Sequence, residues 1–133
     1  MKKFAMAAAT AALLLSVSTG ALAATGLGSV TSMSGSAATA DKAGSVTVNT
    51  TMCALELDDE GKIVSVSFDI AQNKIGFDAA GALTTDLAAE HPTKKELKEG
   101  YGMKGASSIG KEWYEQAEAL EAWCVGKTVA EVV

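Results

Sequence analysis

The stretch that decides the fold runs from Ser45 to Ile70 and reads SVTVNTTMCALELDDEGKIVSVSFDI. In its second half, apolar side chains from Val64 to Ile70 alternate with serine and aspartate. This period of two is typical of a strand with one buried face. In its first half the apolar positions change parity near Thr50–Met52, which predicts either a β-bulge or a strand covered on both faces.

Turn residues divide this stretch into the two strands of a hairpin and mark the ends of the neighbouring segments. Asp58-Asp59-Glu60-Gly61-Lys62 predicts a hairpin turn in which Gly61 takes a positive φ. The chain alternates weakly from Gly26 to Met33, which predicts an earlier strand, and residues 78–81 predict a second turn. We therefore expect an antiparallel sheet of about four strands between Gly26 and Phe77.

The second half of the chain changes to helical signals. Thr93 and Glu96 form a capping-box pattern, so we expect a short helix that ends by Gly100 or Gly102. Ser107 or Ser108 is then expected to cap the main amphipathic helix, which runs from Ser107 to Val125 and packs across one face of the sheet. Its apolar stripe comprises Ile109, Trp113, Ala117, Leu120 and Cys124. The fold class expected is α+β.

A second capping-box pattern, Thr128 with Glu131, stands just before the last residue, Val133. It predicts either a short helical stub that docks on the domain or a shortened form of a longer chain.

The N-terminus has the pattern of a secretory signal peptide. Met1-Lys2-Lys3 is basic, a short apolar run follows, and Ala21-Leu22-Ala23 is a cleavage motif. We expect residues 1–23 to be removed and residues 24–133 to form one domain that is exported, extracellular or in the cell envelope, with no transmembrane segment. The apolar run is too short for a membrane span.

The charge of the chain excludes nucleic acid as a partner. The net charge is −5 at pH 7 and no arginine is present. Nucleic-acid affinity comes from cations that neutralise phosphates, which this chain lacks in number. Any bound phosphate must be held by lysine, hydroxyl or backbone N–H groups, because a bidentate guanidinium is not available.

The two cysteines, Cys53 and Cys124, leave two alternatives open. In an exported protein an even count is compatible with one disulfide, which would close a long loop. Alternatively, both thiols are buried as small apolar side chains.

The most informative segment for function is rich in glycine and runs from Gly100 to Gly110. A glycine-rich turn that leads into a helix N-terminus presents free N–H groups, which suit a phosphate or carboxylate. The alternative is that these residues only form a turn and a cap. The candidate binding residues are Tyr101, Gly102, Lys104, Gly105, Ala106, Ser107 and Ser108, with Lys111 at the rim.

These residues carry a family resemblance. Lys104-Gly105-Ala106-Ser107-Ser108, followed by an amphipathic helix, resembles the serine/threonine-glycine-alanine-threonine segment of FMN-binding domains. Residues 59–66 are similar to the acid-Gly-Lys-Ile-x-x-Val strand pair of that family. The stretch Gly44–Val133 also resembles small exported FMN-binding-like proteins of anaerobic Gram-positive bacteria.

The resemblance implies a flavin cofactor and a role in electron transfer. In flavin-carrying members, FMN is joined by a phosphoester to the last threonine of the segment, and Ser107 stands at the matching position. Lys104 replaces the family's serine or threonine, and the upstream aspartate is missing, so we expect flavin that is noncovalent or absent rather than an ester at Ser107. Tyr101 and Trp113 are candidates to stack on the flavin ring, although the apolar stripe also places Trp113 in the core.

Other site classes are not supported by the residues. His91 is the only histidine and follows an acidic loop residue, and the acidic hairpin 58–60 lacks the ligand spacing of a calcium loop, so no metal site is expected. Ser107 has no triad pattern around it, so we do not expect a hydrolase.

The leading hypothesis is therefore a secreted FMN-binding-like module for extracytoplasmic electron transfer or flavin sensing, with a flavin or other phosphate-bearing small molecule as ligand and a redox protein as partner. The alternative is a non-catalytic exported interaction domain that has lost flavin and binds a cell-surface or protein partner.

Overall fold

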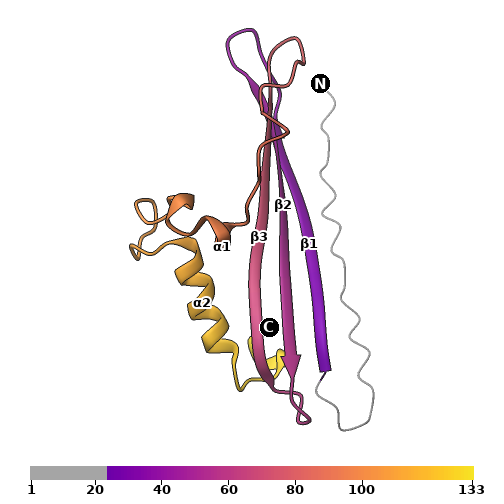
Figure 1. Cartoon of the computed structure of the whole chain (residues 1–133), viewed down its shortest axis with the longest axis vertical. Coiled ribbons are helices and arrows are strands. Elements are labelled where there is room, and N and C mark those ends of the chain that lie inside the picture. The colour runs from indigo at the N-terminus through magenta and orange to yellow at the C-terminus, as the bar shows by residue number, and fades with distance from the viewer. Residues whose placement is uncertain (1–23) are drawn as a thin grey trace.

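The structure, a computed structural model, describes residues 24–133 of the chain. The signal-peptide prediction falls on residues 1–23 and lies outside this range. The strands are β1 (Ala24–Ser36), β2 (Gly44–Leu57) and β3 (Ile63–Phe77), which form an antiparallel sheet in the order β1-β2-β3 (Figure 1). The α+β class is confirmed. The prediction of about four strands is wrong, because the sheet of residues 24–133 has three strands, of which β3 runs unbroken to Phe77.

The parity change in β2 has an explanation other than a central bulge. The β2–β3 register runs unbroken from Gly44 to Glu56, and the irregularity falls only between Glu56 and Leu57. Of the two alternatives predicted, the β-bulge near Thr50–Met52 is therefore wrong. Instead, Val46 and Val48 lie on one face of the sheet, and Cys53, Leu55 and Leu57 lie on the other.

The face against which α2 packs is called the helix-side face, and the opposite face is called the open face. The helix-side face carries Cys53, Leu55 and Leu57 of β2, opposite Val66 and Phe68 of β3, and α2 packs against it. The open face carries apolar side chains that remain exposed, including Leu27, Met33 and Val46. Apolar side chains of β2 thus lie on both faces of the sheet: Val46 and Val48 on the open face, and Cys53, Leu55 and Leu57 on the helix-side face.

Both predicted turns are confirmed and share one construction. The Asp58 carboxylate accepts backbone N–H bonds from Glu60 and Lys62, each at 2.9 Å, and Gly61 has φ 77°. At the second turn, the Asp78 carboxylate accepts the N–H groups of Ala80 and Ala82. In both turns the aspartate at the first position therefore stabilises the turn through bonds to the backbone.

The first helical segment begins where the sequence predicts. Thr93 caps α1 (Lys94–Leu97), with a reciprocal bond from the Thr93 N–H to the Glu96 carboxylate at 2.7 Å. A 3₁₀ turn, η1 (Lys98–Tyr101), follows and ends at Gly102, whose φ is 74°.

The main helix, α2 (Trp113–Cys124), begins later than the sequence suggests. The predicted start at Ser107 is wrong, because residues 103–110 form successive turns and Gly110 takes φ 63°, which a helix cannot include. Glu112 is the N-cap residue. Ile109 consequently lies outside the helix and is 66% exposed, so it does not belong to the buried stripe.

The hydrophobic core lies at one end of the sheet. Leu57, Ile63 and Cys124 are buried together, and Val129 and Val132 of α3 (Val129–Val132) pack against them. The chain before α3 also pairs with β3, since Ile63 donates its N–H to Lys127 O and accepts the N–H of Gly126, both at 2.8 Å. The capping box at Thr128 thus begins a stub that docks on the domain, as one of the two alternatives predicted.

Candidate functional site

A pocket of about 450 Å³ lies between the helix-side face of the sheet and α2. From α2 it takes side chains spaced by three and four residues, which is the side of a helix that faces one neighbour. We call it the sheet–helix pocket, and it is lined by Thr51, Phe68, Met103, Trp113, Gln116, Ala117 and Leu120. Its lining is mainly apolar, and it is an open groove rather than an enclosed cavity, since Leu120 is 46% exposed and Thr51 is exposed.

Gln116 joins the pocket to the segment that precedes α2. Its side-chain nitrogen donates to the Lys111 carbonyl at 3.0 Å and to the Ser107 hydroxyl at 3.2 Å. The same nitrogen lies 3.9 Å from the Met103 sulfur. The pocket wall and the glycine-rich segment are therefore held as one unit by an amide that is itself part of the lining.

A buried carboxylate occupies the backbone donors of the glycine-rich segment. Glu112 is only 5% exposed and accepts the N–H groups of Met103, at 2.8 Å, and Lys104, at 3.0 Å. The Glu112 carboxylate thus accepts two backbone N–H groups that could otherwise bind an external anion. The sequence reasoning missed this residue, and its only signal was an acidic residue just before the first turn of the helix.

Lys94 places a buried cation beside the pocket. Its Nζ lies 4.7 Å from the centroid of the Tyr101 ring and 5.5 Å from that of Trp113, which lines the pocket. These distances are within the range of cation–π attraction. Among the ion pairs of residues 24–133, Lys94 has no carboxylate partner.

The predicted binding residues separate into two groups. Tyr101 lies under Lys94, and Ser107 is half-buried and bonded to Gln116, so these two are brought to the pocket's edge. The others, Gly102, Lys104, Gly105, Ala106 and Ser108, lie exposed in turns. A Cβ at Gly105 would meet nothing within 4 Å, so no close approach of a neighbour explains that glycine.

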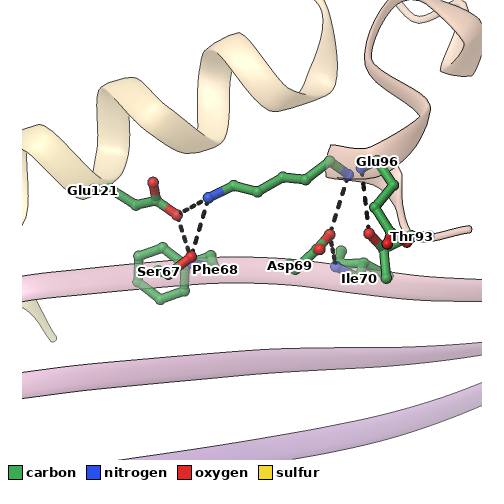
Figure 2. Close-up of polar contacts among 8 residues, drawn as sticks. Ser67, Phe68, Asp69, Ile70, Thr93, Glu96 and Glu121 are labelled. Atoms are coloured by element: carbon green, nitrogen blue, oxygen red, sulfur yellow. Dashed lines mark hydrogen bonds and ion pairs between the residues drawn. The ribbon is translucent and has the colours of Figure 1, made fainter.

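Beside the pocket, the outer edge of β3 is fastened to both helices (Figure 2). Lys95 of α1 contacts the Glu121 carboxylate of α2 at 2.5 Å and the Ser67 hydroxyl at 3.2 Å. Glu121 also accepts the backbone N–H of Phe68 at 2.6 Å. These contacts fix the distance between α2 and the sheet, and with it the width of the pocket.

The two cysteines lie at the same sheet–helix interface. Cys124 is 1% exposed within the core, and Cys53 is half-buried on the same face of the sheet as Leu55. Burial raises the pKa of the Cys53 thiol, and the neighbouring Cys124 and Glu121 raise it further. Both thiols are free in the structure, and a bond between them stays a prediction.

Two other features are not found within residues 24–133, the part of the chain that the structure describes. No group of three or more histidine, cysteine, aspartate or glutamate side chains there is arranged to hold a metal ion, and His91 is exposed. No helix in this range has the length and apolar character required to cross a membrane.

Comparison with known proteins gives one partial relative. The chain is 38% identical over 96 residues to a protein of Desulfitobacterium hafniense named chlorophenol reductase. The match covers 64% of this chain but spans only 29% of the relative's length. No family model matches the chain, and no solved structure matches it. The similarity therefore concerns a portion of a longer protein.

Proposed function

We propose that the protein is a flavin-binding module and that the ring system of FMN lies in the sheet–helix pocket. The observation that carries this proposal is the lining of the pocket, in which Phe68, Trp113 and Met103 offer apolar and aromatic surface to a planar ring. The polar contact that fixes orientation would come from the amide oxygen of Gln116, because the amide nitrogen already donates to Lys111 and Ser107.

Lys94 gives the pocket its redox character in this proposal. A fixed positive charge close to a flavin ring stabilises negative charge on it and raises its reduction potential. The Tyr101 and Trp113 rings hold the Lys94 ammonium in place, so its position does not depend on the ligand. Bound flavin would supply electron transfer, and the chain would bind, orient and tune it.

The phosphate of FMN must be held elsewhere than at the donors of Met103 and Lys104. Because Glu112 occupies those two N–H groups, a phosphate there would also meet a buried carboxylate. The exposed Lys104 remains in the same segment to bind a phosphate, whereas the Lys111 ammonium is already paired with the Glu115 carboxylate at 2.7 Å. Lysine at position 104 in place of the family's serine or threonine, and the missing upstream aspartate, support noncovalent attachment rather than an ester at Ser107.

The partial relative supports a redox role. That protein is named a reductase, and a reductase transfers electrons to its substrate. The proposal takes from the name only this class of chemistry, because the matched part is 29% of the relative. In the proposed role, this chain carries or senses electrons together with a redox protein partner.

The test is titration of the purified protein with FMN, followed by quenching of flavin fluorescence. Leu120→Trp places a ring in the pocket, whereas Ala119→Trp places the same ring on the neighbouring, exposed residue of α2. We expect the parent and Ala119→Trp to bind alike and Leu120→Trp to lose at least about tenfold in affinity, or 1.4 kcal/mol. Absence of binding by the parent, with no flavin band in the protein as isolated, would refute the proposal.

A second candidate function is a non-catalytic interaction domain that has lost flavin. Glu112 favours it, because this carboxylate removes the backbone donors that a phosphate site would use. The same titration separates the two functions. In addition, if attachment is noncovalent, Ser107→Ala should leave the amount of copurified flavin unchanged, and the denatured parent should carry no flavin adduct by mass spectrometry.

For the location of the protein, we propose export with cleavage after Ala23, on the basis of the basic start, the apolar run and the Ala21-Leu22-Ala23 motif. Intact-mass analysis of protein from culture supernatant should give Ala24 as the first residue. Recovery of a chain that retains Met1 from the cytosol would contradict it.

A further inference from the structure

The two outer edges of the sheet differ in whether other residues bind their free backbone groups. At β3 the free edge is covered: Phe68 N–H donates to Glu121, Gly76 N–H donates to the Thr85 hydroxyl at 2.8 Å, and Gly76 O accepts Thr84 N–H at 2.9 Å. Sheet edges are commonly protected in this way, because open N–H and C=O groups pair with other strands.

β1 forms the opposite edge and has no such cover among residues 24–133. It is a 13-residue strand without charge or proline, and both α1 and α2 contact β3, on the far side of the sheet (Figure 1). Leu27, Val30 and Met33 are 75%, 54% and 63% exposed. A long uncharged edge strand of this kind is a template for strand addition.

The ladder defines which groups of β1 point outward. Because the Phe68 N–H points away from β2, its partner Cys53 must direct its backbone groups to Gly28 of β1. Even-numbered residues of β1 therefore bond to β2, and the odd-numbered residues direct their N–H and C=O groups outward. The outward residues are Thr25, Leu27, Ser29, Thr31, Met33 and Gly35.

We propose that β1 pairs antiparallel with β1 of a second copy of the chain, about a two-fold axis at Val30. In this register, Leu27 lies opposite Met33 of the second copy, and Ser29 lies opposite Thr31. Every outward residue thus faces an outward residue, as an antiparallel ladder requires. The two three-stranded sheets become one continuous sheet with both α2 helices at its outer ends.

The side chains of β1 favour a second copy over an unrelated strand. The apolar positions 27, 30 and 33 are symmetric about Val30, so each apolar side chain meets another one: Leu27 meets Met33 on the open face, and Val30 meets Val30 on the helix-side face. The chain carries a net charge of −5, yet this seam contains no charged residue, so self-pairing places no like charges opposite each other.

The test begins with the mass of the purified protein in solution by light scattering at high micromolar concentration, where we expect a dimer. Leu27→Lys/Met33→Lys and Leu27→Glu/Met33→Glu each place like charges opposite one another across the seam, so each variant alone should be monomeric. When mixed, they should form a heterodimer, because lysine at 27 then faces glutamate at 33. As a control, Val64→Lys/Ile109→Lys makes the same charge change at exposed residues outside β1 and should remain dimeric.

A second measurement tests the register itself. Val30→Cys places two thiols opposite each other at a non-hydrogen-bonded pair, where a disulfide fits, and mild oxidation should give a covalent dimer. Ser36→Cys places its thiols at opposite ends of the seam and, like the parent with its native cysteines, should not cross-link. A monomeric parent, or equal cross-linking by the two variants, would overturn the proposal. Neither result depends on flavin.

Discussion

Lys95 and Glu121 form an ion pair of 2.5 Å between Nζ and Oε1 that joins α1 to α2 across the edge of β3. Their side chains are only 22% and 14% exposed. Glu121 also accepts the Phe68 N–H, so the same carboxylate takes the place of a neighbouring strand (Figure 2). Glu121 of α2 therefore binds both to α1, through Lys95, and to β3, through Phe68.

Glu121→Gln should destabilise the protein by about 1–3 kcal/mol. The substitution removes the charge, weakens the bond to Phe68 N–H, and leaves the Lys95 ammonium in a partly buried site without its counter-ion. The measurement is the free energy of unfolding from urea denaturation of the parent and the variant at neutral pH.

The control is a more exposed ion pair between Lys111, which precedes α2, and Glu115 in its first turn, with 2.7 Å between Nζ and Oε1. Lys111→Met should change the free energy of unfolding by no more than about 0.5 kcal/mol, since screening by water weakens exposed pairs. Equal losses in the two variants would mean that the Lys95–Glu121 contact has no special structural role.

The strands and turns could be predicted from the sequence because their signals are local. The alternation from Val64 to Ile70 and the glycine at 61 each determine a conformation within a few residues. The parity change in β2 was ambiguous for a physical reason: a bulge and a strand with two partly apolar faces give the same pattern. The unbroken register between β2 and β3 distinguishes them, and that register depends on a second strand.

The site was less predictable because it depends on contacts between distant segments. Serine is a preferred N-cap residue and glutamate is not, yet the helix begins after Glu112, because the left-handed Gly110 prevents a start at Ser107. The sheet–helix pocket joins Thr51 and Phe68 to residues some fifty positions later, for which no motif spacing exists. Sequence spacing therefore identified the right segment but not the groups that line the pocket.

If Cys53 and Cys124 become bonded, the disulfide would connect β2 to the end of α2. In the chain-entropy model, closing a loop of about 70 residues contributes roughly 4 kcal/mol, less any strain. We expect unfolding of the oxidised protein to shift to a lower denaturant concentration when a reductant is added. Thiol counting on the folded, unreduced protein is the check, because two free thiols there would show that the cysteines only fill the core.

Tyr114 should ionise at unusually high pH. Its hydroxyl donates to the Glu99 carboxylate at 2.8 Å, and this bond, with burial and the Glu99 charge, raises the pKa of Tyr114 to about 12. Because the folded-state pKa lies above the ordinary value of about 10, the contribution to stability is complete below that value and is lost as the pH rises through 12.

The ultraviolet absorbance of the phenolate measures this titration. Glu99→Gln should move the Tyr114 midpoint down towards 10, whereas Glu118→Gln, which removes a more distant charge on α2, should move it little. Equal shifts in both variants would attribute the effect to general negative charge rather than to the hydrogen bond with Glu99.

Glu112 should be among the most sensitive acidic residues of α2. Glu112→Ala removes the acceptor of the Met103 and Lys104 N–H groups and the N-cap side chain of the helix. The expected loss is about 2–4 kcal/mol in the free energy of unfolding, because two partly buried donors are left without a charged acceptor. Glu118→Ala, at an exposed position of the same helix, should stay within about 0.5 kcal/mol of the parent.

The same variant shows whether the carboxylate stands in for an external anion. Once Glu112 is removed, the Met103 and Lys104 donors lie free close to the positive end of α2, an arrangement that attracts phosphate. Added inorganic phosphate should therefore raise the thermal midpoint of Glu112→Ala and leave those of the parent and Glu118→Ala almost unchanged, at matched ionic strength with chloride. If phosphate stabilises the parent as much as the variant, an anion binds at a place other than these two donors, and Glu112 does not occupy an anion site.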